Sequence, residues 1–265
     1  MKILSSIKNT LSHTRRRLRG AFSKMAFARS ERKKESDELV ASLHNAHTGR
    51  RAFIVCNGPS LRAADLTRIH DNADISIASN KIHQIFTQTP WRPTYYCAFD
   101  EVLQYHLDDI LPVVSAQASF LRREAFTATR RFSQPIAWLR AYGSRSLLDT
   151  PRMSTDLSQG IFTIATVTYA MIQVALHMGI REIYIIGCDN KYAREVKQDG
   201  TIVTHGGPSY FAGAKPDAIP ASTWEMNRAF ENAARYAAAN GISIFNATRG
   251  GYLEAFPRVD FDTLF

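Results

Sequence analysis

Three sequence features that would each identify a class of protein are scarce or missing: cysteines, long apolar runs and repeats. It holds three cysteines in 265 residues, and Cys56, Cys97 and Cys188 lie singly in apolar, strand-like runs, without the paired spacing of a metal site. It has no uninterrupted apolar run that could cross a bilayer, because the longest apolar region, 161–180, contains several polar side chains. No internal repeat or low-complexity segment is present. These absences favour a folded, reduced, cytoplasmic chain with buried thiols.

Acidic residues are nearly missing from residues 1–34. That segment holds eleven of the 33 Lys and Arg residues and one acid, Glu31, whereas the other 231 residues hold 22 basic and 23 acidic side chains. The net charge of +9 therefore comes from the N-terminal segment. Because the rest of the chain is close to neutral, its net charge gives no support to a nucleic-acid-binding face. We expect no nucleic acid among the partners.

The basic N-terminal segment also carries apolar residues at roughly helical intervals, namely Ile3, Leu4, Ile7, Leu11, Leu18, Phe22 and Met25. This pattern is typical of a basic amphipathic helix that lies on an anionic membrane surface. A solvated, partly disordered tail explains the same composition equally well. Under the first interpretation, residues 1–34 attach a cytoplasmic protein to the inner membrane as a peripheral protein.

Residues 1–50 are predicted to form an arm and a linker, and residues 51–265 a single α/β domain. Seven apolar runs in this domain are typical of strands: 52–56, 73–79, 94–99, 118–123, 136–141, 182–188 and 242–247. Two strong helical patterns lie between them, 160–179 and 222–241, each ending in a glycine, and the second opens with a Ser/Thr cap and Glu225 in position for a capping box. The alternation predicts a mostly parallel, Rossmann-like sheet with helices on both faces.

Five of the seven predicted strands end in Asn or Asp: Asn57, Asn80, Asp100, the Asp189-Asn190 pair and Asn246. Either residue type is common in turns, so any one of these positions has an ordinary explanation. In open α/β sheets, however, ligands bind beyond the carboxyl ends of the strands. Together the five positions predict one ligand crevice at that edge of the sheet.

The loop Asn57-Gly58-Pro59-Ser60 follows the first predicted strand. Gly58 permits close approach of a ligand, Pro59 suits the first position of a helix, and Ser60 adds a hydroxyl. A helix N-terminus attracts phosphate, so the loop is predicted to bind a nucleotide phosphate, although a plain strand-to-helix turn has the same sequence. Neither a Walker loop nor a dinucleotide fingerprint is present.

A second loop of this kind contains Ser158 and Gly160, before the helix predicted from residue 161. It is expected to hold a base or ribose while the first loop holds the phosphate. Near the C-terminus, Arg249 stands before a pair of glycines, where it could clamp a phosphate or carboxylate, or instead pair with acids at the surface.

The segment 189–220 is long, irregular and rich in Gly and Pro, which is typical of a lid over a substrate; we call it the lid segment. It contains Tyr192, His205 and Tyr210, which could stabilise a leaving phosphate or act as a base. His205 is either a general base or an ordinary exposed loop histidine. The Asp189-Asn190 pair has no second carboxylate at ligand spacing, so no metal site is predicted.

Five segments of the chain together resemble the domain family named after the archaeal hydroxymethylpterin diphosphokinase: VCNGPSL, ASNKI, RPTYYCAFD, IYIIGCDNKY and NATRGGYLEAFPRVDF. The layout is also similar to bacterial sialyltransferases, in which a strand is followed by Gly-Asn-Gly-Pro-Ser-Leu. The resemblance covers about residues 50–265. In those enzymes the Asn-Gly-Pro-Ser loop and a later Ser-Gly helix start bind a CMP-sugar.

The resemblance implies that loops at the strand ends bind the CMP-sugar donor. Asn57, Gly58 and Ser60 would contact the phosphate or ribose of the donor, and Asn80 its sugar or phosphate. Ser158 and Gly160 would contact the sugar carboxylate or the cytidine, and Asp189 and Tyr192 would lie near the nucleotide. One departure concerns the catalytic base. The sialyltransferases have a histidine just before the helix that starts here near Ser222, and this sequence has none there. His205 or a carboxylate such as Asp100 would replace it, or the chemistry differs.

The sequence thus predicts a glycosyltransferase that moves an acidic sugar, sialic-acid-like or Kdo-like, from a CMP-activated donor to a cell-surface glycan or glycolipid, in capsule or lipopolysaccharide assembly. It would need no cofactor, because backbone amides, Tyr and Lys can stabilise the leaving phosphate. The alternative is a pyrophosphokinase that uses ATP and magnesium on a pterin-like alcohol, against which the scarcity of carboxylates at the strand ends counts. A non-catalytic nucleotide-binding protein is a third interpretation.

Overall fold

The computed structural model describes residues 27, 29–100, 103, 106–127, 132–143, 145–150, 152–214 and 220–265. The predicted amphipathic arm lies outside the described residues apart from its last few positions, so its role at a membrane stays a prediction. Among the helices that the structure describes, none is both long and apolar enough to span a bilayer.

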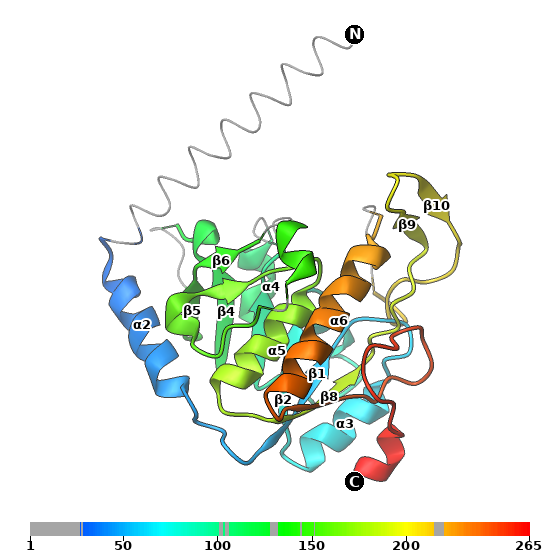
Figure 1. Ribbon diagram of the computed structural model, residues 1–265. Coiled ribbons are helices and arrows are strands. Elements are labelled where there is room, and N and C mark those ends of the chain that lie inside the picture. Colours follow the sequence, from blue (N-terminus) through cyan, green and yellow to red (C-terminus); the bar gives the residue numbers. More distant parts are fainter. Residues whose placement is uncertain are drawn as a thin grey trace.

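A parallel sheet of seven strands forms the centre of the domain (Figure 1). All seven strands that the sequence predicts belong to it: β1 (Arg51–Val55), β2 (Ile75–Ser79), β3 (Tyr95–Ala98), β4 (Ala118–Arg122), β5 (Ile136–Leu139), β8 (Glu182–Ile186) and β11 (Ser243–Asn246). Their order is β11-β8-β1-β2-β3-β4-β5, and each neighbouring pair runs parallel. The predicted Rossmann-like α/β class is confirmed.

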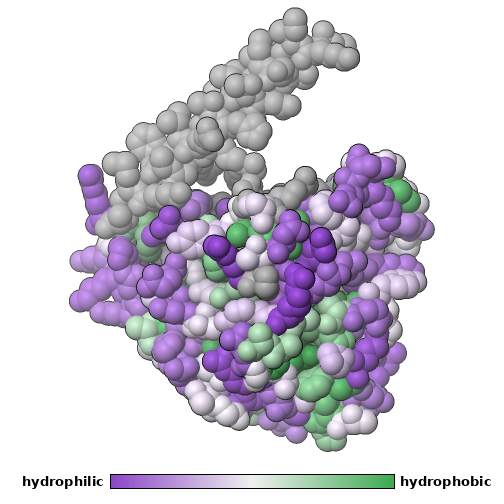
Figure 2. Space-filling view, viewed as in Figure 1, coloured by the Kyte–Doolittle hydropathy of each residue, from purple (hydrophilic) through white to green (hydrophobic). Residues whose placement is uncertain are grey.

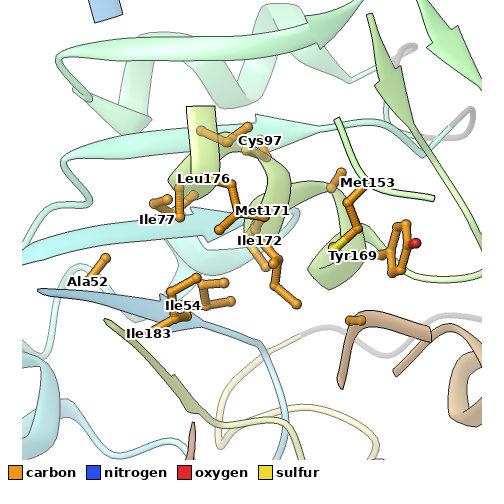
Figure 3. Close-up of a cluster of buried hydrophobic side chains, with 14 of the residues drawn as sticks. Ala52, Ile54, Ile77, Cys97, Met153, Tyr169, Met171, Ile172, Leu176 and Ile183 are labelled. Atoms are coloured by element: carbon orange, nitrogen blue, oxygen red, sulfur yellow. The ribbon is translucent and has the colours of Figure 1, made fainter. Parts of the chain in front are cut away.

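One face of the sheet is covered by three helices: α2 (Glu31–Leu43), α5 (Val167–His177) and α6 (Thr223–Ala239). Ala52 and Ile54 of β1 point to this face, where they pack against α5. Figure 3 shows Met171, Ile172 and Leu176 of α5 over the sheet, with Leu176 beside Ile77 of β2. Ten consecutive residues of α5, from Thr168 to His177, are buried, as expected of a helix enclosed by the sheet and its neighbours.

The opposite face is covered by α3 (Ala63–Asp71) and α4 (Leu107–Val114). Phe53 and Val55 alternate with the β1 residues of the first face, because successive side chains of a strand point to opposite sides. The C-terminal turn η6 (Phe261–Leu264) docks on the same side, with the Phe261 ring 6.0 Å from that of Phe53. The chain end is thus part of the packed structure.

The predicted helix 160–179 is wrong at its start. Ile161 and Phe162 form a short strand, β7, that pairs with β6 (Ala141–Tyr142), and α5 begins only at Val167. Buried Gln173 fixes this geometry, since its Oε1 accepts the Phe162 N–H and its Nε2 donates to the Phe162 carbonyl. In the predicted helix the Phe162 carbonyl would instead accept the backbone N–H of residue 166.

The expected helix start at Pro59 is also wrong, because α3 begins at Ala63 with Arg62 as its N-cap. Residues 58–60 form a turn instead. The Gly58 N–H donates to the carbonyl of Gly187 over 2.7 Å, and the Leu61 N–H donates to the Gly58 carbonyl over 3.1 Å. The loop therefore closes on the end of β8 before the chain turns into α3.

The lid segment is more regular than the sequence predicts. It contains an antiparallel hairpin, β9 (Arg194–Val196) and β10 (Ile202–Thr204), which projects at the upper right of Figure 1. The Val196 N–H donates to the Ala221 carbonyl over 2.8 Å, which ties the hairpin to the entrance of α6. Ser222 is the N-cap of α6, but its side chain makes no cap hydrogen bond, so the predicted capping box is not formed by Ser222.

The remaining short elements are the 3-10 turns η1 (Ile82–Ile85), η3 (Arg123–Ala125), η4 (Arg145–Asp149) and η5 (Leu157–Gln159). Figure 2 shows hydrophilic residues over most of the face seen in Figure 1, with hydrophobic residues gathered low on its right side. The apolar residues of the strands lie under the helices, which explains why this outer face is mostly polar.

Candidate functional site

The strand order places the site between β1 and β8. From β1 the chain continues through β2 to β5 on one side, and β8 then returns to the other side of β1. Such a reversal is where an open α/β sheet leaves a crevice at the carboxyl ends of its strands. A cavity of about 1040 Å³ is found there, lined by the ends of β1, β2, β3 and β8, by the start of α5 and by the lid segment.

Nine residues that the sequence predicts for the site line this cavity: Asn57, Gly58, Pro59, Asn80, Asp100, Asp189, Asn190, Tyr192 and Tyr210. Six others lie outside its lining: Ser60, Ser158, Gly160, His205, Asn246 and Arg249. Four of the five predicted strand ends thus meet at one edge of the sheet as expected, whereas the fifth, Asn246 at the end of β11, lies outside the cavity lining.

Asp189 and the loop after β1 are joined directly. One carboxylate oxygen of Asp189 accepts hydrogen bonds from the Ser60 N–H, over 3.1 Å, and from the Ser60 hydroxyl, over 2.8 Å. A Cβ on Gly58 would lie 2.1 Å from the same oxygen, which only glycine avoids. Ser60 therefore uses its hydroxyl to position Asp189, and Gly58 makes the close approach possible.

Several polar atoms at this edge lack a partner. The side-chain oxygens of Asn57, Asn80 and Asn190 and the hydroxyl of Ser79 are buried without a hydrogen bond among the described residues, and all four residues line the cavity. Leaving a buried polar group unsatisfied costs about 1–3 kcal/mol, so such groups in native proteins mark bound water or ligand. Their concentration here favours a polar ligand.

Backbone strain gathers at the same place. Asn80, Ala165 and Asn190 have φ angles of 56°, 54° and 51°, in the left-handed region, and all three line the cavity. Asn tolerates this conformation, but Ala does so at a cost. Strained positions of this kind cluster at ligand sites.

The N-terminus of α5 also opens into the cavity, and sequence reasoning missed it. Thr163, Ala165, Thr166, Val167 and Thr168 line the cavity. Thr166 is the N-cap, and its hydroxyl accepts the Thr168 N–H over 3.3 Å. The start of a helix of eleven residues carries the partial positive charge that attracts anions. A Thr before the longest buried run was the available signal, but the apolar residues before it concealed the helix start.

Ser158 and Gly160 lie elsewhere, in η5 and the turn after it. The backbone N–H of Ser158 donates to Asp156 over 2.9 Å, and hydrogen bonds from Ser158 lower the pKa of that carboxyl group. Gly160 has a φ of 108°, and a Cβ there would lie 2.6 Å from the Arg140 carbonyl and from the Tyr142 ring. Both residues have a structural explanation within this turn.

The lid segment is fastened to the loop after β1. The Phe211 N–H donates to the Asn57 carbonyl over 3.0 Å, and the Phe211 side chain is buried. Lys81 Nζ lies 5.1 Å from the centre of the Tyr210 ring. Burial raises the pKa of Tyr192, with Cys188, Cys56, Tyr210 and Asp189 adding to the effect. The Tyr192 phenol, like any tyrosine, is protonated near neutral pH, and since Tyr192 lines the cavity it can donate a hydrogen bond there.

His205 lies outside the cavity lining. It follows β10, and its Nε2 lies 3.4 Å from Glu195 on β9, whose carboxylate also contacts Lys197 at 3.1 Å. These three side chains form a polar cluster on the hairpin. In this conformation His205 occupies the place of an exposed loop histidine, the second of its two sequence interpretations.

Asn246 and Arg249 stabilise the C-terminal part of the fold. Asn246 is fully buried, its Nδ2 donating to Leu253 over 2.7 Å and its Oδ1 accepting the Thr248 N–H over 2.9 Å. Arg249 makes paired hydrogen bonds with Asp262, at 2.8 Å, and with Asp65, at 3.0 Å, and these raise its pKa. Arg249 therefore pairs with acids, as its second interpretation states, although only Asp262 is exposed and Asp65 is buried.

The charges that line the cavity favour an anion. Four are cationic, Lys81, Arg122, Lys191 and Arg194, and two are carboxylates, Asp100 and Asp189. The two carboxylates follow β3 and β8, which are separated by β2 and β1, so their backbones lie roughly 14 Å apart at the usual strand spacing. Among the described residues, no group of three or more His, Cys, Asp or Glu side chains is arranged to hold a metal ion.

Fold and cavity together define a Rossmann-like α/β protein with a cavity, lined by four cationic side chains, at the switch point of its sheet. Residues 28–195, more than half of the chain, match the family described as 6-hydroxymethylpterin diphosphokinase MptE-like. The chain belongs to this family, which confirms the predicted resemblance. Among curated proteins, none matches the sequence.

Among solved structures, the chain is similar to the MAf glycosyltransferase from Magnetospirillum magneticum AMB-1, with a TM-score of 0.51 and 16% sequence identity. The similarity covers 88% of this chain and 39% of the other. At this identity the match shows a shared fold, and the chain spans well under half the length of that protein.

Proposed function

We propose that the protein is a glycosyltransferase that binds a CMP-activated acidic sugar in the switch-point cavity and transfers it to a cell-surface glycan or glycolipid. The observation that carries the proposal is the cavity itself: about 1040 Å³ at the switch point, with four cationic side chains and the N-terminus of α5 in its lining. Pockets for small molecules of this size class measure about 300–1,000 Å³. The shared fold with a glycosyltransferase and the family membership agree with an enzyme of this kind.

In this proposal the donor's anionic groups bind between the α5 N-terminus and the loop at Asn57 and Gly58. Backbone N–H groups at a helix start and cationic side chains stabilise the charge that develops when CMP leaves. Tyr192 and Tyr210, both protonated at neutral pH, supply hydrogen-bond donors from the lid segment. The donor's ribose and base would contact the amide side chains of Asn80 and Asn190.

Asp100 is our candidate for the general base that activates the acceptor hydroxyl. It lines the cavity just after the end of β3, and its side chain is exposed to solvent. A carboxylate in that position can take a proton from an acceptor that enters from the solvent side. His205 would need to move with the lid segment to do the same.

An ATP-dependent pyrophosphokinase is the second candidate, because the family's description names a diphosphokinase. Such an enzyme binds magnesium with carboxylates beside the ATP phosphates. The wide separation of Asp100 and Asp189 across the sheet does not favour a shared magnesium site.

Thermal unfolding with CMP, UDP, GDP, ADP and ATP, each with and without magnesium, tests the proposal. Saturation at about 100 times the dissociation constant stabilises a protein by about 2.7 kcal/mol, which is a rise in Tm of about 5–10 °C for a domain of this size. We expect this rise with CMP and no metal. A response restricted to ATP with magnesium would support the pyrophosphokinase instead, and the absence of any nucleotide response would contradict both candidates.

We further propose that residues 1–34 hold the enzyme on an anionic membrane surface, where lipid-linked acceptors are found. Support for this comes from the basic and amphipathic composition of the segment. The enzyme would then be cytoplasmic and peripheral at the inner membrane.

A further inference from the structure

Tyr252 is the most exposed of the large apolar side chains that the structure describes, with 63% of its surface accessible. It follows Gly250 and Gly251 in the loop after β11, drawn in red on the right of Figure 1 beside the segment that leads from β8 to β9. A packed tyrosine buries roughly 150–250 Å². A ring left in solvent contributes little of that to the stability of the fold, so its position calls for another explanation.

The loop that carries Tyr252 is held firmly. The Tyr252 N–H donates to the Asp189 carbonyl over 2.7 Å, and a Cβ on Gly251 would lie 2.8 Å from the Asp189 backbone. Arg258 donates to the carbonyls of Gly250, over 2.8 Å, and Gly251, over 3.0 Å. An aromatic ring on a fixed loop loses little conformational entropy when it binds a ligand.

Lys191 connects this ring to the cavity. Its Nζ lies 5.7 Å from the centre of the Tyr252 ring, and Lys191 itself lines the cavity. Tyr252 does not belong to the lining, so the ring stands at the rim, outside the volume available to a donor. An aromatic face next to an ammonium group suits a pyranose that carries an acid: the C–H groups of one sugar face pack on the ring, and the carboxylate or phosphate pairs with the lysine.

We propose that Tyr252 and Lys191 form a subsite for an anionic pyranose of the acceptor, at the rim of the cavity. This inference rests on the proposed function and deepens it, since it names the class of acceptor. The ring fixes the plane of the sugar, and Lys191 selects a sugar with a negative substituent directed toward the cavity.

The test uses two simple probes, methyl β-galacturonide and methyl β-galactoside, which differ only in the carboxylate. Binding to the full chain is measured by saturation-transfer NMR titration, with and without saturating CMP. We expect the galacturonide to bind more tightly than the galactoside, and Tyr252→Ala to weaken its binding at least tenfold. Tyr252→Phe keeps the ring and should stay within twofold of wild type. Lys191→Gln should bring the two glycosides within twofold of each other.

Ile202→Ala is the matched control, because Ile202 is the next most exposed large apolar residue, at 52%, and lies on the β9–β10 hairpin. It should leave glycoside binding unchanged. The inference is wrong if wild type binds neither glycoside, or if Tyr252→Ala binds the galacturonide as wild type does. Displacement of the galacturonide by CMP would assign the ring to the donor and also overturn it.

The CMP thermal shift separates the two proposals. Tyr252→Ala should leave the CMP-induced rise in Tm unchanged, since the ring lies outside the cavity lining. If the protein shows no CMP-induced rise in Tm but binds the glycoside in a way that depends on Tyr252, the donor proposal is refuted and the sugar subsite is retained. A protein that responds to CMP with no glycoside binding would refute the subsite alone.

Discussion

Ser60 holds Asp189 in place at the floor of the cavity through two hydrogen bonds to one carboxylate oxygen. We predict that Ser60→Ala, which removes the hydroxyl donor, lowers the free energy of unfolding by about 1.5 kcal/mol and weakens CMP binding. Urea denaturation and the CMP thermal shift measure the two effects. Ser158→Ala is the matched control, since Ser158 lies in an exposed turn outside the cavity lining, and it should change stability by less than about 0.5 kcal/mol.

A pair of variants can distinguish Asp100 from His205 as the general base. Loss of a general base usually slows a reaction by about 10²–10⁴-fold, so we predict this loss of sugar transfer in Asp100→Asn, with the CMP-induced rise in Tm retained. His205→Ala should transfer sugar at nearly the wild-type rate, because His205 faces Glu195 outside the cavity lining. The opposite ranking of the two variants would mean that the base comes from the lid segment.

At the scale of elements, His177 links α5 to two other parts of the chain. Its Nδ1 lies 3.2 Å from the Leu157 N–H of η5, and its Nε2 lies 2.8 Å from the Val40 carbonyl of α2. This pairing requires a neutral ring with the proton on Nε2. Burial lowers the pKa of His177 below its ordinary value of 6.5, and nearby His44 acts in the same direction against the hydrogen bond to Val40.

The lowered pKa of His177 determines how the stability of the fold depends on pH. Below pH 6.5 His177 is protonated more readily in the unfolded chain than in the folded protein, because its pKa is lower when folded. Its contribution to the free energy of unfolding is therefore fully present above pH 6.5 and is lost as the pH falls. We predict that the free energy of unfolding decreases between pH 6.5 and 5, and that His177→Gln reduces this slope. Denaturant unfolding at several pH values measures it. His47 and His83 also have pKa values lowered by burial, so part of the slope should persist in the variant.

The seven strands of the sheet were predictable because each is a short apolar run, and five of these runs end in Asn or Asp, which are local properties of the sequence. Their carboxyl ends had to meet at one edge, so Asn57, Asn80, Asp100 and Asp189 were predictable as neighbours of a crevice. The start of α5 was not, because it depends on Gln173, which binds the backbone of residue 162 eleven positions earlier in the chain. Contacts of that kind leave no pattern in a window of sequence.

The roles of Ser60 and Arg249 illustrate the same limit. Ser60 follows a loop that suits phosphate, yet its hydroxyl is directed to Asp189, 129 positions away in the chain. Arg249 stands beside flexible glycines, yet Asp65 and Asp262 occupy its guanidinium group. Asp189 and Asp65 come from distant parts of the chain, and only the folded sheet brings them to Ser60 and Arg249.

At the scale of the whole molecule, positive charge and the folded domain are separate. Residues 1–26 hold seven Lys and Arg and no acid, whereas Phe27 packs on Phe126 with ring centres 5.1 Å apart. We predict that deletion of residues 1–26 abolishes binding to vesicles that contain phosphatidylglycerol and leaves the CMP thermal shift unchanged. Vesicle sedimentation at low and high salt provides the measurement, because electrostatic attachment weakens as salt increases. Retained sedimentation of the truncated chain would remove the anchor from the proposal.

The hydrogen bond from Phe211 to Asn57 has a kinetic consequence. The lid segment and the loop proposed to hold the donor share this bond, so a ligand that leaves past Phe211 requires it to break. The rate at which the Phe211 amide hydrogen exchanges with solvent deuterium therefore reports how often the site opens. A donor that contacts both the loop and the lid segment should slow this exchange. The residence time of the donor can then be followed at a single amide, without knowledge of the acceptor.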